Sequence, residues 1–125
     1  MHLKLISTSL ILTAIALPTF AGGDADMGKK VFRKCKACHA IGEGAKNKVG
    51  PVLAGVIDAP FGANPDYKYS KAMKEKNAEG EVWTTENLTA FLTKPKDVVP
   101  GTKMSFPGLK KAEDIENILA YLASF

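Results

Sequence analysis

This sequence is short of several residue types on which common folds and binding sites depend. It contains two cysteines, two histidines and one tryptophan among 125 residues, and Arg33 is the only arginine among its 17 basic residues. Nucleic-acid sites favour arginine because its planar guanidinium contacts bases and phosphates through paired hydrogen bonds. The scarcity of arginine therefore argues against a nucleic-acid partner. A lysine-rich chain with a formal charge of +4 is suited to acidic protein surfaces, although simple solubility explains the same composition.

The longest apolar run is also shorter than the ~20 residues that a membrane-spanning helix needs. It covers residues 5–17, follows a short positive segment with His2 and Lys4, and precedes small residues that end at Ala21. This order is typical of a secretory signal peptide. We therefore expect residues 1–21 to be cleaved and residues 22–125 to form a single domain. A retained membrane anchor is the alternative.

An alternating strand pattern, internal repeats and low-complexity tracts are absent as well. Apolar residues at helical spacing predict four helices, over residues 25–37, 70–76, 84–93 and from 112 onward. Asp24 and Thr84 are suited to cap the first and third of these helices. Glycine and proline recur through residues 41–65, which are predicted to be loop. The expected fold class is all-α, with loops so long that a bound group is needed to organise them.

The two cysteines belong to one motif, Cys35-Lys36-Ala37-Cys38-His39. Two thiols three residues apart, followed at once by histidine, are the pattern of covalent c-type haem attachment. In that pattern the thiols bond to two vinyl groups of one macrocycle, and the histidine comes up beneath the iron.

The cysteine pair allows three other interpretations. A disulfide is possible in an oxidising compartment. A thioredoxin-like pair requires a βαβ context, and the sequence shows no strands. A structural zinc site needs about four nitrogen or sulfur ligands. Residues 22–125 hold only two cysteines and one histidine, so haem attachment is the favoured interpretation.

The second axial iron ligand has to come from outside the motif. His39 is the only histidine beyond residue 21, so the opposite ligand must be of another type. Methionine is the usual soft alternative and raises the potential of the iron. Met27 and Met73 are expected to pack in the core or on the surface, which is the common role of methionine. Met104 lies in a loop bounded by Pro-Gly pairs, and we expect it to reach the distal side.

Taken together, these features identify a resemblance. Residues 22–125 resemble class I cytochromes c, and most closely the bacterial cytochromes c2. Beyond the attachment motif, the resemblance rests on residues 23–32, 50–53, 67–70, Trp83, 100–106 and 119–122. It implies a fold of a few helices and long Gly/Pro-rich loops wrapped around one covalent haem c.

The resemblance also implies roles for individual residues. For the iron and the thioethers these residues are Cys35, Cys38, His39 as proximal ligand and Met104 as distal ligand. Around the haem they are Pro51, whose carbonyl accepts from His39, Tyr69 and Trp83, which donate to a propionate, and Phe106, which covers the haem edge. Gly28 and Phe32 are implied to meet Ile118 and Tyr121 where the first and last helices cross.

The chain departs from many relatives at three places near the implied haem. It has Asp58-Ala59-Pro60 where they have an arginine, Phe91 where they have a tyrosine, and Met73 where they have an asparagine. All three changes make the distal pocket more apolar. We therefore expect an altered redox potential.

The function implied by the resemblance is that of a periplasmic one-electron carrier and not of an enzyme. The protein is expected to be a monomer that docks on acidic faces of membrane redox complexes. The donor would be a quinol:cytochrome c oxidoreductase, and the acceptor a photosynthetic reaction centre or a terminal oxidase. The lysines expected to ring the docking edge are Lys34, Lys36, Lys46, Lys48, Lys94, Lys96 and Lys103. The alternatives are a peroxidase or gas-binding haem protein, and a dedicated acceptor for a periplasmic dehydrogenase.

Overall fold

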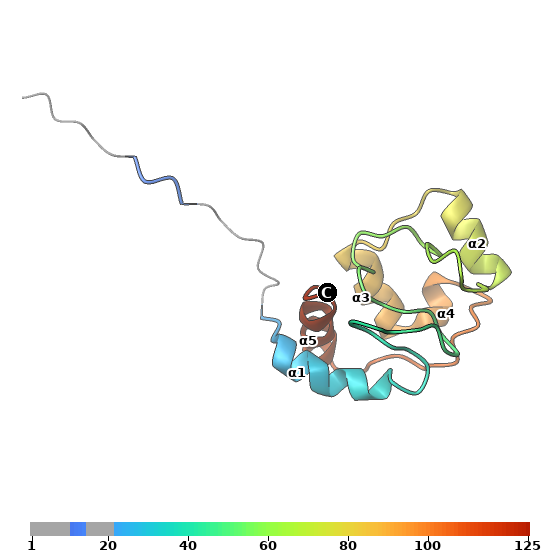
Figure 1. The fold of residues 1–125 in the computed structure, drawn as a ribbon, viewed down its shortest axis with the longest axis horizontal. Coiled ribbons are helices and arrows are strands. Elements are labelled where there is room, and N and C mark those ends of the chain that lie inside the picture. The colour runs from blue at the N-terminus through green and yellow to red at the C-terminus, as the bar shows by residue number, and fades with distance from the viewer. Residues whose placement is uncertain (1–10, 15–21) are drawn as a thin grey trace, which may run out of the picture.

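The computed structural model describes residues 11–14 and 22–125, and the expected signal peptide lies almost entirely outside these described residues. Five α-helices and one 3₁₀ helix follow in the order α1 Ala25–Val31, η1 Phe32–Lys34, α2 Lys71–Ala78, α3 Thr85–Thr93, α4 Pro95–Val98 and α5 Ala112–Leu122 (Figure 1). Within the described ranges there is no strand, and the only β-type pairing is a single bridge between Pro60 and Val82. The predicted all-α class is confirmed.

Local capping sets where three of the helices begin. The Asp24 side chain accepts hydrogen bonds from the backbone N–H groups of Asp26 and Met27, as predicted. Thr84 caps α3 in the same manner, and Ser70 caps α2. Each side chain satisfies donors that have no partner within the helix itself. None of the helices in the described part of the chain is long and apolar enough to cross a membrane.

The first helix ends earlier than predicted, α2 extends beyond the predicted residue 76 to Ala78, and α4 was not predicted. The helix expected over residues 25–37 is α-helical only to Val31, because η1 tightens the chain and Cys35 N–H bonds to the Phe32 carbonyl at 2.8 Å. The attachment motif therefore lies in turns beyond the helix. Pro95 ends α3, as predicted, but it also begins α4. Proline is suited to the first helical position, where its missing N–H is not needed.

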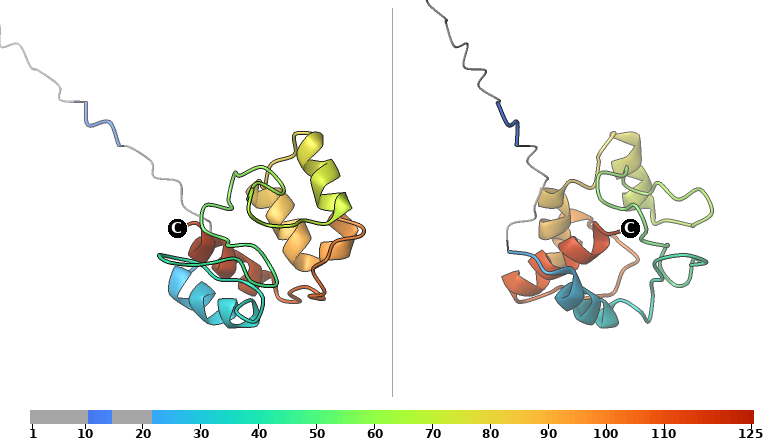
Figure 2. Two further views of the ribbon diagram at one scale, coloured as in Figure 1. Left: turned by 45° about the vertical axis from the view of Figure 1, so that its right-hand side comes forward. Right: turned by 60° about the vertical axis from the view of Figure 1, so that its left-hand side comes forward.

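Helices α1 and α5 cross at close range, and the views in Figures 1 and 2 show them side by side. Gly28 permits this approach, because a Cβ at that position would lie 2.0 Å from the Asn117 carbonyl oxygen. Phe32 and Tyr121 meet across the crossing with ring centroids 5.4 Å apart. The crossing implied by the resemblance is confirmed.

The hydrophobic core connects this helix pair with α3. Phe32 and Ile118 are almost fully buried, as are Leu88 of α3 and Phe61 and Val99 of the connecting segments. Residues 40–70 run over the other side of the molecule without regular structure, and they include the loop predicted over residues 41–65. Helices α1, α3 and α5 thus form a helical frame, and residues 40–70 form a loop layer that faces it (Figure 2). The candidate site lies between the frame and the loop layer.

Candidate functional site

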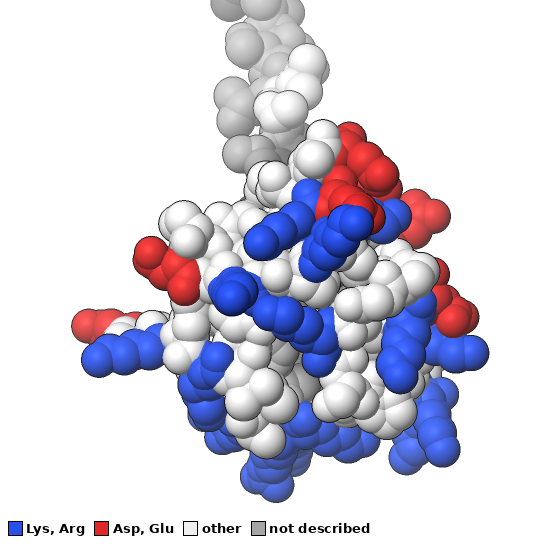
Figure 3. Space-filling view, turned by 90° about the vertical axis from the view of Figure 1, so that its right-hand side faces the viewer, with Lys and Arg blue, Asp and Glu red and all other residues white. Residues whose placement is uncertain are grey.

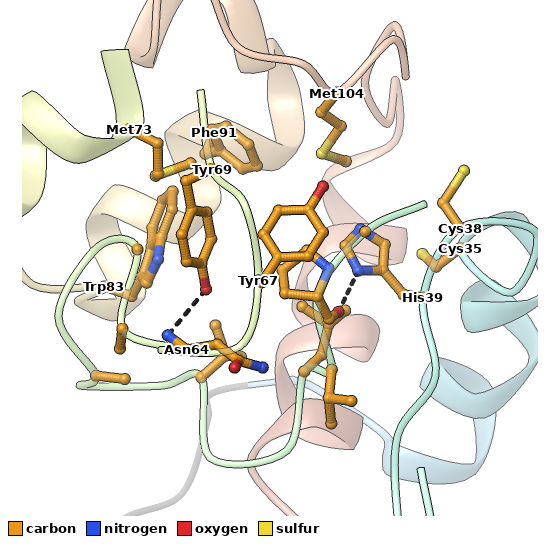
Figure 4. Close-up of a pocket in the computed structure, with 18 of the residues that line it drawn as sticks. Cys35, Cys38, His39, Asn64, Tyr67, Tyr69, Met73, Trp83, Phe91 and Met104 are labelled. Carbon is orange, nitrogen blue, oxygen red and sulfur yellow. Dashed lines mark hydrogen bonds between the residues drawn. The ribbon is translucent and has the colours of Figure 1, made fainter. Parts of the chain in front are cut away.

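A cavity of about 480 Å³ lies between the helical frame and the loop layer. Its wall is mostly apolar and includes side chains from α3, from α5, from the loop layer and from the loop that carries Met104. It brings together most of the predicted site residues, namely Cys35, Cys38, His39, Pro51, Tyr69, Trp83 and Met104 (Figure 4). Phe106 does not line it; its half-buried side chain packs against the hydrophobic core instead.

The turns after η1 place both cysteines and His39 at one edge of the cavity. Cys38 N–H and His39 N–H both bond to the Cys35 carbonyl, at 3.1 and 2.8 Å, which closes the motif into a tight turn. Burial raises the pKa of the Cys35 thiol, the nearby Cys38 raises it further, and Lys34 opposes them. Cys35 is therefore held as a thiol at neutral pH.

The His39 ring is fixed by two contacts. Its Nδ1 donates to the Pro51 carbonyl at 2.7 Å, the contact that the resemblance implied. Gly50 packs against the ring so closely that a Cβ there would lie 2.3 Å from His39 Cε1. Burial lowers the pKa of His39, the Pro51 carbonyl opposes this effect, and the Lys48 ammonium lowers it further. With Nδ1 protonated in a neutral ring, Nε2 keeps the lone pair that a metal needs.

Tyr69 and Trp83 bring polar hydrogens to a mostly apolar wall. The Tyr69 hydroxyl oxygen accepts from the Asn64 backbone N–H at 3.0 Å, which leaves its own proton to be donated. Burial raises the pKa of Tyr69, the bond from Asn64 opposes this, and Tyr67 adds to it. Trp83 is stacked on Phe61 with centroids 3.6 Å apart and brings an indole N–H, which only donates.

Two methionines line the cavity, and the sequence predicted one of them, Met104, as an iron ligand. Met104 enters from the loop after α4, and its backbone N–H bonds to Thr102 Oγ1 at 3.2 Å. In Figure 4 it lies above the His39 ring. Met73 of α2 also lines the cavity and lies near Tyr69 and Trp83 in the same view. Helical spacing alone favoured core or surface packing for Met73, whereas the resemblance placed it near the haem, and the structure agrees with the resemblance.

The three departures from the relatives lie on this side of the cavity too. Phe91 is buried, lines the cavity and meets the Trp83 ring edge to face, with centroids 4.8 Å apart. Asp58 has φ 63°, and its backbone N–H bonds to the Trp83 carbonyl at 2.8 Å. Asp58 itself does not line the cavity, whereas Ala59 and Pro60 do. The segment offers no cation at the cavity wall.

Many lysines lie on one face of the molecule (Figure 3). In Figure 3, Lys and Arg side chains extend across this face and along its lower edge, whereas Asp and Glu lie at its upper right and at its left edge. Lys103 lines the cavity, and its ammonium donates to the Lys68 carbonyl at 2.6 Å. Lys48 similarly donates to the Lys36 carbonyl at 2.6 Å. Because carbonyls and not carboxylates hold these two lysines, their positive charge stays uncompensated.

Comparison with known proteins agrees with this geometry. The family profile described as Cytochrome c matches residues 25–125. The chain is 53% identical over 100 residues to a cytochrome c2 of Agrobacterium tumefaciens (strain II Chrys), covering 80% of this chain and 90% of that one. It is 51% identical to a cytochrome c-550 of Ancylobacter novellus, covering 78% and 92%. The solved structure of cytochrome cH from Methylobacterium extorquens superposes with a TM-score of 0.75 at 42% identity, covering 82% and 100%.

The cofactor of such proteins is a single covalently attached haem c, and the residues at the cavity fit it. The cavity volume lies within the range of about 300–1,000 Å³ that is usual for cofactor sites. Its wall supplies the two thiols of the chain, one neutral imidazole and the thioethers of two methionines, together with a mostly apolar surround. A planar apolar macrocycle with a central iron requires this combination.

Proposed function

Because the chain belongs to the cytochrome c family and is a cytochrome c electron carrier, we propose that it shuttles single electrons in the periplasm through a His39/Met104-ligated haem. The observation that supports this is the meeting of Cys35, Cys38, His39 and Met104 in one apolar cavity. Cys35 and Cys38 would form the two thioethers. The bound haem supplies one-electron chemistry between the ferric and ferrous states of its iron.

The protein's own residues determine how that chemistry is used. Pro51 fixes the orientation of the His39 ring through the Nδ1 hydrogen bond, which leaves Nε2 available to bind the iron. Met104 would bind the iron from another part of the cavity wall, and an iron held by both His39 and Met104 would have no free site for a substrate or gas. This distinguishes a carrier from a peroxidase or gas-binding protein. Tyr69 and Trp83 would donate to a propionate, while Phe106, outside the cavity wall, would cover the haem edge.

Docking would use the lysine-rich face. Uncompensated lysines such as Lys48 and Lys103 beside the cavity attract acidic faces and raise the rate of encounter. The partners we propose are a quinol:cytochrome c oxidoreductase as donor and an oxidase or reaction centre as acceptor. Export would depend on residues 1–21, which have the layout of a cleaved signal peptide.

Optical spectroscopy tests the ligation directly. Methionine bound to ferric iron gives a weak absorbance band at the red edge of the visible spectrum. We expect this band in the wild-type protein and its loss in Met104→Ala, with Met73→Leu as the matched control that keeps it. A wild-type protein that lacks the band and binds carbon monoxide at neutral pH would contradict the carrier function. Electron transfer that is insensitive to salt would contradict the docking proposal.

A further inference from the structure

Two asparagine side chains join the loop that orients His39 to the loop that holds Tyr69. Asn47 Oδ1 accepts from the Val52 backbone N–H and from Asn64 Nδ2, both at 2.9 Å. Asn64 uses its other polar groups as well: Oδ1 accepts from the Asp66 N–H at 3.0 Å, and its own N–H donates to the Tyr69 hydroxyl at 3.0 Å. Both asparagines are half-buried.

The chemistry of these groups fixes which atoms face each other. A backbone N–H only donates, so the oxygen of Asn47 must face Val52, and the same oxygen must receive Asn64. Asn64 must then present its nitrogen, because its oxygen is engaged by Asp66. The arrangement depends on an acceptor at position 47 and a donor at position 64. No charge is involved.

The contacts on either side connect this pair to the functional site. Val52 follows Pro51, whose carbonyl receives His39 Nδ1. Asn64 bonds directly to the hydroxyl of Tyr69, which lines the cavity. Hydrogen bonds thus run from the proposed proximal ligand, through both asparagines, to the proposed propionate donor.

We propose that Asn47 and Asn64 are positioning residues that set the His39 and Tyr69 sides of the haem site against each other. This inference rests on the proposed function, because it assigns the pair to the two sides of the haem. Tyr67 supplies a comparison. Its hydroxyl joins the same two loops by donating to the Val49 carbonyl at 2.5 Å, but among the described residues it makes no hydrogen bond to Val52 or to the Asn64 side chain.

A charge-matched pair of variants tests the proposal in the haem-loaded protein. Asn47→Asp keeps an oxygen acceptor, whereas Asn64→Asp removes the donor and sets two oxygens against each other. We expect the His39 Nδ1–H and the Val52 N–H to exchange with solvent about tenfold faster in Asn64→Asp, as the loss of a hydrogen bond of about 1.4 kcal/mol implies. Asn47→Asp should exchange like the wild type, and Asn47→Leu like Asn64→Asp.

Tyr67→Phe is the control, and the amides of α5 report global stability. Unchanged α5 exchange together with unchanged His39 Nδ1–H exchange in Tyr67→Phe is the expected result. Equal effects of Asn47→Asp and Asn64→Asp, or an equal effect of Tyr67→Phe, would overturn the proposal. The exchange is measured on the His39 side of the site, so it can be read even if the Met104 band is missing and the proposed function fails.

Discussion

The helical frame and the loop layer build opposite sides of one cavity by different physical means. In the α1–α5 pair, backbones approach at Gly28 and side chains such as Phe32 and Ile118 are almost fully buried. In the loop layer, Phe61 is fully buried and Leu53 and Val56 line the cavity, while most of the remaining order depends on turns and side-chain hydrogen bonds. The frame therefore holds itself together, whereas the loop layer depends on the group that fills the cavity.

Removal of the haem should have the largest effect on the difference in stability between the frame and the loop layer. We expect Cys35→Ser/Cys38→Ser, prepared without haem, to lose structure in residues 40–70 while α1 and α5 keep part of their contact. An unfilled cavity of about 480 Å³ would cost up to about 12 kcal/mol at roughly 24 cal/mol per Å³, which rivals the whole stability of a typical domain. Hydrogen exchange resolved by segment measures the outcome. Wild-type protection of residues 40–70 would contradict it.

The frame itself is most sensitive at Gly28. In Gly28→Ala, the new Cβ would lie 2.0 Å from the Asn117 carbonyl oxygen and 2.7 Å from Tyr121 Cβ, so the helices must separate. We expect a loss of at least about 3 kcal/mol in the free energy of unfolding, measured in urea on the haem-loaded protein. Gly44→Ala is the control: its φ is 72° and nothing lies within 4 Å, so about 1 kcal/mol should be lost. Similar losses in the two variants would refute the close-approach argument.

The same contrast explains what could be predicted from the sequence. Asp24, Thr84 and the spacing of Ile115, Ile118 and Leu122 specify helices through local interactions, and the helices they predict are present. The predicted end of the first helix was wrong, because the hydrogen bond from the Cys35 N–H to the Phe32 carbonyl belongs to a turn that apolar periodicity does not encode. Helix α4 was not predicted, because Pro95 both ends α3 and begins α4, and the sequence pattern indicates only the first of these roles.

Within the site, the sequence singled out residues of rare types and overlooked residues of common types. Cys35, His39 and Met104 stood out because cysteine, histidine and methionine are scarce in this chain, and all three line the cavity. Asn47 and Asn64 did not, because asparagine in a loop is ordinary and their partners are fixed only by the folded loops. Phe106 follows a cavity-lining residue, but adjacent side chains in an extended loop point in different directions.

A smaller effect is expected at Gly50, where the loop layer meets the proposed iron ligand. In Gly50→Ala, a Cβ would lie 2.3 Å from His39 Cε1 and 2.7 Å from Nδ1, so the ring must move and lengthen its bond to Pro51. We expect a loss of about 1–3 kcal/mol in unfolding free energy and faster exchange of the Nδ1–H. A side-chain ring shifts more easily than a helix backbone, so the loss should be smaller than in Gly28→Ala. An unaltered Nδ1–H would show that the ring does not depend on Gly50.

The smallest change concerns Phe91, which belongs to the helical frame but faces the cavity. Phe91→Tyr adds a hydroxyl at a buried position, beside Trp83 and on the wall that Met104 also lines. We expect stability to change by no more than about 1 kcal/mol, because the hydroxyl can donate to the Met104 sulfur. That bond would withdraw electron density from the ligand, disfavour ferric iron and raise the midpoint potential. Redox titration of Phe91→Tyr against wild type measures the shift, with Phe91→Leu as a control that adds no donor. Equal potentials in Phe91→Tyr and wild type would show that the missing hydroxyl does not set the potential, and the frame would then contribute only packing to this side of the site.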